Sequence, residues 1–339
     1  MSRIPSIAEL AGLVIAKEAH PVAAHTSTDE NRRVDLKEAS CEIEITVVTV
    51  CFNPLASGRR EVFLKNLDSV QAQEGVNLEH LIIDGASTDG TLEWLKAYHN
   101  TKHDIRILSL PDKGIYEAMN RGIALSRGKY VIFLGSDDYF HHPGGMLASM
   151  TRIKEFGCQF TFAPVRFSDK SIRHNPQLAP QWRLHRFLVS WCFSHQTMLT
   201  LRSALLRVDG FDIAYRSAAD YDLLLRLIAD GARGCFVPCT FATFNVEGFS
   251  KENRDLAIQE CTQILQDFYR YYYSAEMTYD EVAYIVKHRV YPHRYMYIYK
   301  DTQKLIRERF IGVPGGLKAW LSRWFNYIKY YLKCRNSSI

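Results

Sequence analysis

Residues 45–135 alternate between two hydrophobic patterns, and this alternation limits the folds that the chain can adopt. Short runs rich in β-branched residues predict buried strands, and segments with apolar residues three or four positions apart predict helices between them. The predicted strands are residues 43–53, 78–84, 104–110 and 129–135, and the predicted helices are residues 60–73, 91–98 and 114–128. Strands that are joined by helices pair in parallel. We therefore predict an α/β fold with a mostly parallel, Rossmann-like sheet flanked by helices.

Local signals add detail to two of these helices. Ser87 or Thr88 is expected to cap the second helix, because a hydroxyl oxygen can accept a hydrogen bond from a free N–H group of the first turn. In the third helix, Ile115, Met119 and Ile123 are spaced so that they share one face. Gly128 is expected to end this helix.

The regular alternation ends after about residue 145, and the chain divides into three parts. Further elements are expected as a strand at 158–167, a strand that continues into a helix at 198–208, a helix at 218–231, and helices after about residue 250 with breaks near 291–292 and 312–316. The predicted parts are an N-terminal arm (1–41), an α/β domain (42–250) and a helical C-terminal extension (251–339).

Composition indicates a globular protein of the cytoplasm. The chain has 339 residues, of which 47% are hydrophobic, and this is enough for a substantial core. No apolar run approaches the roughly 20 residues that span a bilayer, and charged residues interrupt the apolar N-terminal stretch. The eight cysteines have neither disulfide-framework nor zinc-ligand spacing, so we expect reduced thiols.

Positive charge is concentrated at the C-terminal end. From residue 285 onward, twelve lysines and arginines face two acidic residues, whereas the whole chain carries +5. Residues 317–331 place leucine, tryptophan, isoleucine and tyrosine side chains along one helical stripe, with the cations largely off it. Such a helix either lies on a membrane surface or packs on the core of the protein. No nucleic-acid-binding module is present, so we do not expect nucleic acid as a partner.

Polar residues follow three of the predicted strands at their carboxyl ends, where open parallel sheets bind ligands. The first strand ends in Cys51-Phe52-Asn53, the second in Asp84, and the fourth in the adjacent pair Asp137 and Asp138. A carboxylate at Asp84 can accept a hydrogen bond from a nucleobase imide. The adjacent aspartates repel each other unless a cation neutralises them. A divalent cation shared with a diphosphate would do so, and the sequence therefore predicts a metal and sugar-nucleotide site.

Five motifs in these segments resemble the family-two glycosyltransferases with a GT-A fold. The motifs are ITVVTVCFN (45–53), LIIDGASTDGT (81–91), DKGIYEAMNRGI (112–123), YVIFLGSDDYF (130–140) and AADYDLLLRL (218–227). They occur in the order and spacing of that family. The form DKGIYEAMNRG is similar to the branch that builds bacterial surface polysaccharides such as O-antigen and colanic acid.

The resemblance implies a set of residues that bind the sugar-nucleotide donor. The segment Thr49–Asn53 and Asp84 would hold the base and ribose, and Lys113 would lie near the base or the phosphates. Many relatives have a second acidic residue, which touches the base, at the position of Gly85. The implied donor-binding residues are Thr49, Val50, Cys51, Asn53, Asp84, Lys113, Asn120 and Asp137.

The same resemblance implies the metal ligand and the catalytic base. Asp138 would bind the metal, with Asp137 nearer the ribose. Asp220 would remove the proton of the acceptor hydroxyl. Asp222 is the alternative base, and helical spacing would direct it about 200° away from Asp220. His195 would orient the acceptor, bind the metal or serve only the structure.

A turn at 247–250, which includes Ser250, resembles a family loop that closes over the donor. We regard Ser250 as a candidate lid residue.

The sequence therefore predicts an inverting glycosyltransferase that depends on Mn²⁺ or Mg²⁺. It would move a sugar from a nucleotide-sugar, expected to be a UDP-sugar, to a saccharide acceptor, expected to be lipid-linked, at the inner face of the membrane. A sugar-nucleotidyltransferase and a non-catalytic nucleotide-sugar or membrane-binding protein are the alternatives. A dehydrogenase is disfavoured because no G-x-G-x-x-G follows the first strand.

Overall fold

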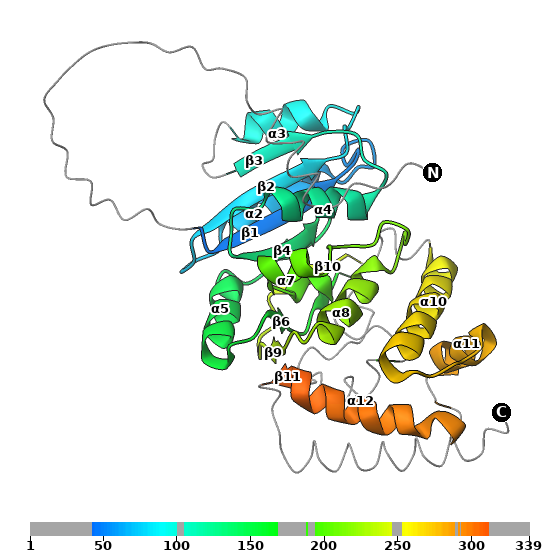
Figure 1. Ribbon diagram of the computed structural model, residues 1–339. Helices are drawn as coiled ribbons and strands as arrows, with labels where there is room; N and C mark the ends of the chain where they lie inside the picture. The colour runs from blue at the N-terminus through cyan, green and yellow to red at the C-terminus, as the bar shows by residue number, and fades with distance from the viewer. Residues whose placement is uncertain are drawn as a thin grey trace, which may run out of the picture.

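A large, mostly parallel sheet forms the centre of the protein (Figure 1). The structure is a computed structural model, and it describes residues 43–99, 105–168, 188, 194–245, 253–288, 291 and 293–311. Within these residues the large sheet has eight strands in the order β11-β9-β6-β8-β4-β1-β2-β3. Their bounds are β1 Ile45–Cys51, β2 Leu78–Asp84, β3 Ile105–Ser109, β4 Tyr130–Gly135, β6 Phe160–Phe162, β8 Thr200–Leu201, β9 Gly234–Phe236 and β11 Phe310–Ile311.

Strand pairing brings the predicted polar ends together. β1 pairs in parallel with β2, and Cys51 lies opposite Asp84. On its other side β1 pairs in parallel with β4, and Val50 lies opposite Gly135. Only β8 runs antiparallel to its neighbours among the described strands of this sheet. The predicted mostly parallel α/β sheet is confirmed, and the carboxyl ends of β1, β2 and β4 share one edge.

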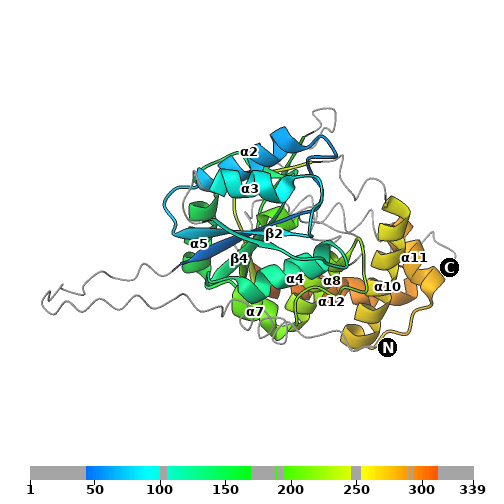
Figure 2. The ribbon, with the colours of Figure 1, turned by 90° about the horizontal axis from the view of Figure 1, so that it is seen from above.

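Helices cover both faces of the sheet (Figure 2). Side chains alternate along β1, so that Val47 packs in the cluster under α2 and α5 and Val48 packs in the cluster under α4 and α8. The α3 helix packs beside α2 on the same face. The bounds of these helices are α2 Arg60–Gln71, α3 Thr91–His99, α4 Ile115–Leu125, α5 Gly145–Phe156, α7 Arg202–Arg207 and α8 Ala219–Ala229.

A small second sheet lies next to the edge that carries the polar residues. Its strands are ordered β5-β10-β7, with β10 antiparallel to β5 and parallel to β7. Their bounds are β5 Tyr139–Phe140, β7 Arg166–Phe167 and β10 Ala242–Phe244, and the 3-10 turn η1 covers His195–Thr197. The segment expected as one strand at 158–167 is therefore two strands, β6 and β7, in different sheets.

The described part of the C-terminal extension shares the core of the sheet domain. Leu265, Ile285 and Ile298 belong to the same buried cluster as Val48 of β1. β11, which the sequence did not predict, pairs with β9 and adds the outermost strand of the large sheet. The elements of this part are α10 Arg254–Tyr273, α11 Tyr279–His288, η2 His293–Tyr295 and α12 Met296–Arg309. Up to residue 311, the extension is thus not separate from the sheet domain.

One local prediction was wrong. The N–H of Thr91 at the start of α3 donates to the carboxylate of Asp89 at 3.1 Å, so Asp89 takes the capping role expected of Ser87 or Thr88. On the α4 face that the sequence predicted, Met119 and Ile123 are buried, whereas Ile115 is 43% exposed and lines the cavity described below. The cavity at the start of α4 is a tertiary feature that helical spacing does not reveal.

Three predicted features lie outside the described residues: the arm at 1–41, the turn at 247–250 with Ser250, and the helical stripe at 317–331. Among the helices that are described, none combines the length and the apolar character needed to cross a membrane.

We predict that Phe310→Ala will lower the free energy of unfolding by about 3 kcal/mol, because Phe310 is 6% exposed and packs edge-on against Phe162 at a centroid distance of 5.5 Å. Urea denaturation followed by circular dichroism should show one cooperative transition that shifts as a whole. Tyr297→Ala, at a 45% exposed position of α12, is the control and should change stability by at most about 0.5 kcal/mol. The appearance of a separate early transition in the Phe310 variant would instead show that the extension unfolds independently.

Candidate active site

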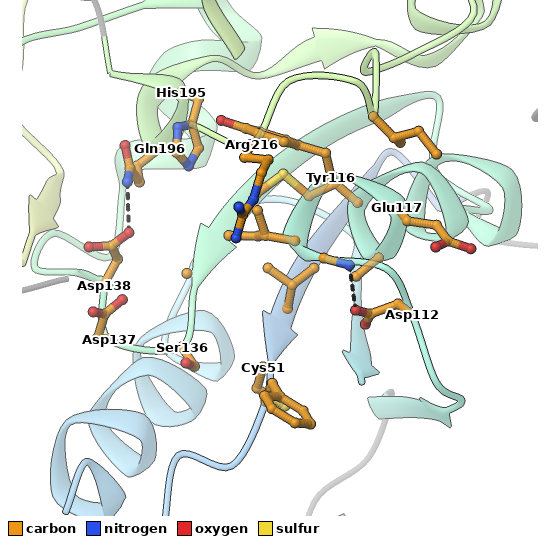
Figure 3. A pocket seen from close by; sticks show the side chains of 18 of the residues that line it. Cys51, Asp112, Tyr116, Glu117, Ser136, Asp137, Asp138, His195, Gln196 and Arg216 are labelled. Atoms are coloured by element: carbon orange, nitrogen blue, oxygen red, sulfur yellow. Dashed lines mark hydrogen bonds between the residues drawn. The ribbon is translucent and has the colours of Figure 1, made fainter. Parts of the chain in front are cut away.

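A cavity of about 460 Å³ opens where β1 and β4 end (Figure 3). Its wall is built from the end of β1, the loop before α4 with the first turns of that helix, the turn after β4, η1, the loop before α8 and the end of β10. Segments far apart in the chain meet here because the parallel strands end at one edge. Ligands of open α/β sheets bind at this position.

The adjacent carboxylates occupy different environments within the turn between β4 and β5. Asp138 is 3% exposed, and its two oxygens accept hydrogen bonds from the backbone N–H of Asn245 at 2.8 Å and from the side-chain amide of Gln196 at 2.7 Å. The side chain of Asp137 is 16% exposed, and its Oδ2 lies 3.7 Å from Nη1 of Arg59. Asp137 is therefore the more open of the two.

Both carboxyl groups resist ionisation. Burial, followed by the charge of Asp137, raises the pKa of Asp138 to about 7. Burial also raises the pKa of Asp137, against the opposing effect of the Arg59 guanidinium. A cation next to this pair would favour the ionised form of both groups.

Asp84, predicted to contact a nucleobase, is buried beneath the cavity. Its side chain is fully shielded from solvent, and its oxygens accept hydrogen bonds from the hydroxyl and N–H of Ser87 and from the hydroxyl of Ser109 at 2.6 Å. Burial, followed by the charge of Asp84, raises the pKa of the Cys51 thiol well above its usual value. In this conformation Asp84 fixes the ends of β2 and β3 and does not face the cavity.

Asp112 places a carboxylate beside Gly85. A Cβ atom on Gly85 would lie 2.7 Å from Oδ2 of Asp112 and 3.3 Å from the ring of Phe52. Oδ1 of Asp112 accepts a hydrogen bond from the N–H of Gly114 at 2.9 Å. Asp112 and the 65% exposed Phe52 both line the cavity. A carboxylate and an uncovered aromatic ring thus meet at the end of β1.

Asp220 forms a pair with His195 at the side of the cavity. Nδ1 of His195 lies 3.2 Å from Oδ2 of Asp220, and His195 lines the cavity. Asp222 lies at hydrogen-bond distance from Arg226, with Oδ2 2.6 Å from Nη2. Arg226 also donates to the carbonyls of Val208 and Gly210. The structure thus gives Asp222 a structural partner and leaves Asp220 beside a cavity residue.

The remaining predicted donor-binding residues divide into two groups. Val50, Cys51 and Lys113 line the cavity. Thr49 and Asn120 do not: Thr49 is fully buried with its hydroxyl 2.8 Å from Nε2 of His80, and Asn120 exchanges two hydrogen bonds with the backbone of Phe211. Both side chains are too buried to contact a sugar-nucleotide donor directly.

Asn53 also has a structural role in this conformation. Its N–H donates to the hydroxyl of Ser87 at 2.8 Å, and its side-chain oxygen accepts from the N–H of Thr88 at 2.8 Å. Asn53 adopts a positive φ of 46°, which asparagine tolerates better than most residues. These bonds connect the loop after β1 to the turn after β2.

Sequence reasoning missed several residues of the site. Gln196 and Asn245 hold Asp138, and Asp112 and Arg216 line the cavity. A local signal existed for Gln196, because it directly follows the candidate residue His195 in the sequence. The other contacts join segments that are distant in the chain. Among the described residues, no group of three histidine, cysteine or acidic side chains is placed to hold a metal ion by itself.

The family model for glycosyl transferase family 2 matches residues 46–213. Chondroitin synthase of Pasteurella multocida (strain Pm70) is 31% identical over 164 residues, which is 48% of this chain and 17% of that protein. A PGL/p-HBAD biosynthesis glycosyltransferase of Mycobacterium tuberculosis (strain ATCC 25177 / H37Ra) is 28% identical over 168 residues, which is 49% of this chain and 64% of that protein. The chain thus spans less than two thirds of the length of either relative.

Solved structures with the same fold come from two other organisms. Residues 1–349 of S. aureus TarS, in complex with UDP-GlcNAc, align with a TM-score of 0.55 and 15% identity over 80% of this chain and 82% of that one. The mannosyltransferase PcManGT of Pyrobaculum calidifontis, in complex with GDP-Man and Mn²⁺, aligns with a TM-score of 0.54 and 14% identity over 86% and 83%. The predicted GT-A fold is confirmed.

We predict that the metal-free protein will lose stability as the pH rises from about 4 to 7, in part through Asp138. Its pKa is higher in the native state than in the unfolded chain, so in this window the native state binds more protons and stability falls with increasing pH. Asp137→Asn removes the second cause of the shift and should make this fall smaller, by about 1.4 kcal/mol for each pKa unit that is lost.

Thermal unfolding in the presence of a chelator at pH 5 and pH 8 measures the difference. Glu155→Gln is the control, because it removes one exposed carboxylate of α5 far from the pair. Identical pH responses of the Asp137 variant and the unaltered protein would show that the two aspartates do not interact.

Proposed function

Because the chain belongs to glycosyl transferase family 2 over residues 46–213, we propose that it transfers a sugar from a nucleotide-sugar to a hydroxyl group of a saccharide, with inversion at the anomeric carbon. The observation that carries this proposal is the arrangement around the cavity. The Asp137–Asp138 pair, the carboxylate of Asp112 and the Asp220–His195 pair all lie at or beside it. Together they provide sites for a diphosphate with its cation, for a nucleobase and for an acceptor hydroxyl.

The aspartate pair fits a divalent cation that also binds the donor diphosphate. Mg²⁺ and Mn²⁺ sites of this kind use one or two carboxylates and complete their coordination with phosphate oxygens and water. We assign Asp137 as the carboxylate that would hold the cation. Asp138, whose oxygens are engaged by Gln196 and Asn245, would support it, which reverses the assignment made from sequence. A bound Mn²⁺ or Mg²⁺ supplies Lewis-acid stabilisation of the charge that develops on the leaving diphosphate.

Asp112 and Phe52 are the proposed contacts of the nucleobase. An aromatic ring can stack on the base, and a carboxylate accepts a hydrogen bond from an imide N–H such as N3–H of uracil. The saturated hydrogen bonding of Asp84 supports this choice over the one made from sequence. We propose a UDP-sugar as the donor, and the UDP-GlcNAc complex of the similarly folded TarS supports it.

Asp220 is the proposed catalytic base. Its carboxylate would take the proton of the acceptor hydroxyl while the hydroxyl oxygen bonds to the anomeric carbon. The bond from that carbon to the diphosphate oxygen breaks, and the diphosphate leaves with the electron pair. An ionised carboxylate only accepts hydrogen bonds, so His195 presents an Nδ1–H to Asp220 and orients it. His195 lines the cavity and contacts Asp220, which supports a role on the acceptor side.

We further propose a lipid-linked acceptor and peripheral association with the cytoplasmic face of a bacterial membrane, in the synthesis of a surface polysaccharide. The basic charge after residue 285 and the aromatic stripe at 317–331 support membrane contact. The similarity to a chondroitin synthase and to a PGL/p-HBAD biosynthesis glycosyltransferase supports a polysaccharide or glycolipid product.

Donor binding tests the proposal most directly. Calorimetry with a panel of UDP-, GDP-, ADP- and CMP-sugars should show that a UDP-sugar binds in Mn²⁺ and that a chelator weakens it at least about 10-fold, because the diphosphate would then face unneutralised carboxylates. Asp112→Ala should reduce the preference for uridine. Glu155→Gln should leave both properties unchanged. Equal affinity in metal and in chelator would remove the proposed cation.

Asp220→Asn should leave donor affinity nearly unchanged and lower kcat about 10²-fold or more, because the amide cannot accept the proton. Release of free nucleoside diphosphate in the presence of acceptor measures turnover. Asp222→Asn is the matched control: it loses its interaction with Arg226 and should lower the melting temperature with little change in kcat for the folded fraction. A fall in kcat confined to the Asp222 variant would transfer the role of base to that residue.

A further inference from the structure

One carboxylate from the C-terminal extension binds the backbone of residues 216–218, which shortly precede Asp220 in the chain. Glu260 on α10 accepts a hydrogen bond from the N–H of Arg216 at 2.8 Å through Oε1. Its Oε2 accepts from the N–H groups of Ser217 at 2.8 Å and Ala218 at 2.9 Å. A single side chain thus satisfies three consecutive backbone donors of the turn that leads into α8.

These bonds hold the turn that leads into α8, where the N-cap residue offers no acceptor side chain. Helix α8 begins at Ala219, and the side chain of its N-cap residue, Ala218, has no hydrogen-bonding group. The N–H groups that Glu260 binds are those of the N-cap residue and of the two residues before it, and a negative charge near a helix start is favoured by the helix dipole. Glu260 supplies this charge from 42 residues further along the chain, where α10 packs beside α8 (Figures 1 and 2).

The same turn carries two groups of the proposed site. Arg216 lines the cavity and its side chain is seen there in Figure 3. Asp220 lies two residues after Ala218, in the first turn of α8, beside His195. Burial, followed by the charges of Asp220 and Glu260, raises the pKa of the hydroxyl of Tyr116, another cavity residue.

We propose that Glu260 is a positioning residue for the transfer reaction: by fixing residues 216–218 it sets the position of the Asp220 carboxylate relative to the cavity. The inference rests on the proposed role of Asp220 as the base. It makes α10 of the C-terminal extension a part of the active site. A displaced base by itself can lower turnover by about 10²-fold, since reacting atoms must be held within a fraction of an ångström.

The test compares Glu260→Ala and Glu260→Gln with Asp267→Asn, a control that removes a carboxylate of the same helix, where Asp267 contacts Gln263 and Arg270. In the full-length protein we expect kcat to fall about 10-fold or more for the alanine variant and less for glutamine, whose single amide oxygen keeps part of the bonding. The calorimetric Kd for a UDP-sugar in Mn²⁺ should change less than about 3-fold, and melting temperatures should confirm that each variant is folded at the assay temperature.

A double-mutant cycle separates positioning from general loss of structure. If Glu260 acts through Asp220, adding Glu260→Ala to Asp220→Asn should lower the residual kcat by less than about 3-fold. Independent, multiplicative effects in the cycle, or full kcat in the folded Glu260→Ala variant, would overturn the inference. If Asp220→Asn alone retains full turnover, the proposed base is wrong, and that outcome is distinct from a failure of the Glu260 assignment.

Discussion

The parallel pairing of β1 with β2 on one side and β4 on the other determines where the polar residues of the site lie. All three strands are buried, and their ladders keep them in register up to Cys51 opposite Asp84 and Val50 opposite Gly135. Because parallel strands end at the same edge, the chain must place its loops there. The cavity, the aspartate pair and the loop with Asp112 all follow from that constraint.

The edge of the sheet carries two adjacent carboxyl groups, Asp137 and Asp138, that do not ionise easily. Asp138 is held by two donors and is nearly inaccessible, yet burial and its neighbour still raise its pKa. A protein that needed only stability would gain by replacing one of these carboxylates. The proposed cation would account for this arrangement, since burial would strengthen its attraction to the pair.

Several side chains that sequence reasoning assigned to the donor instead hold the site in place. Asp84 accepts hydrogen bonds from two serines, Thr49 contacts His80 within the sheet, and Asn120 binds the backbone of Phe211. Apart from Ser87, which lies three residues after Asp84, these partners are 25 to 91 residues away, so the pattern around each residue gives no sign of them. Conversely, the carboxylate of Asp112 occupies space that a side chain at position 85 would need. This relation between Asp112 and Gly85 is visible only in three dimensions.

The sequence by itself determined the alternation of strands and helices, the parallel sheet and the segments that reach its edge, because hydrophobic periodicity acts locally and leaves few topologies. It also drew attention to Asp137 and Asp138, because adjacent carboxylates after a buried strand repel each other, whereas Asp220 was proposed from the family resemblance. Only the tertiary structure decided which carboxylate of the pair is the more exposed, that Asp222 is held by Arg226, and that Glu260 binds the turn before α8. Burial and hydrogen-bond saturation depend on neighbours from distant segments, and no local pattern encodes them.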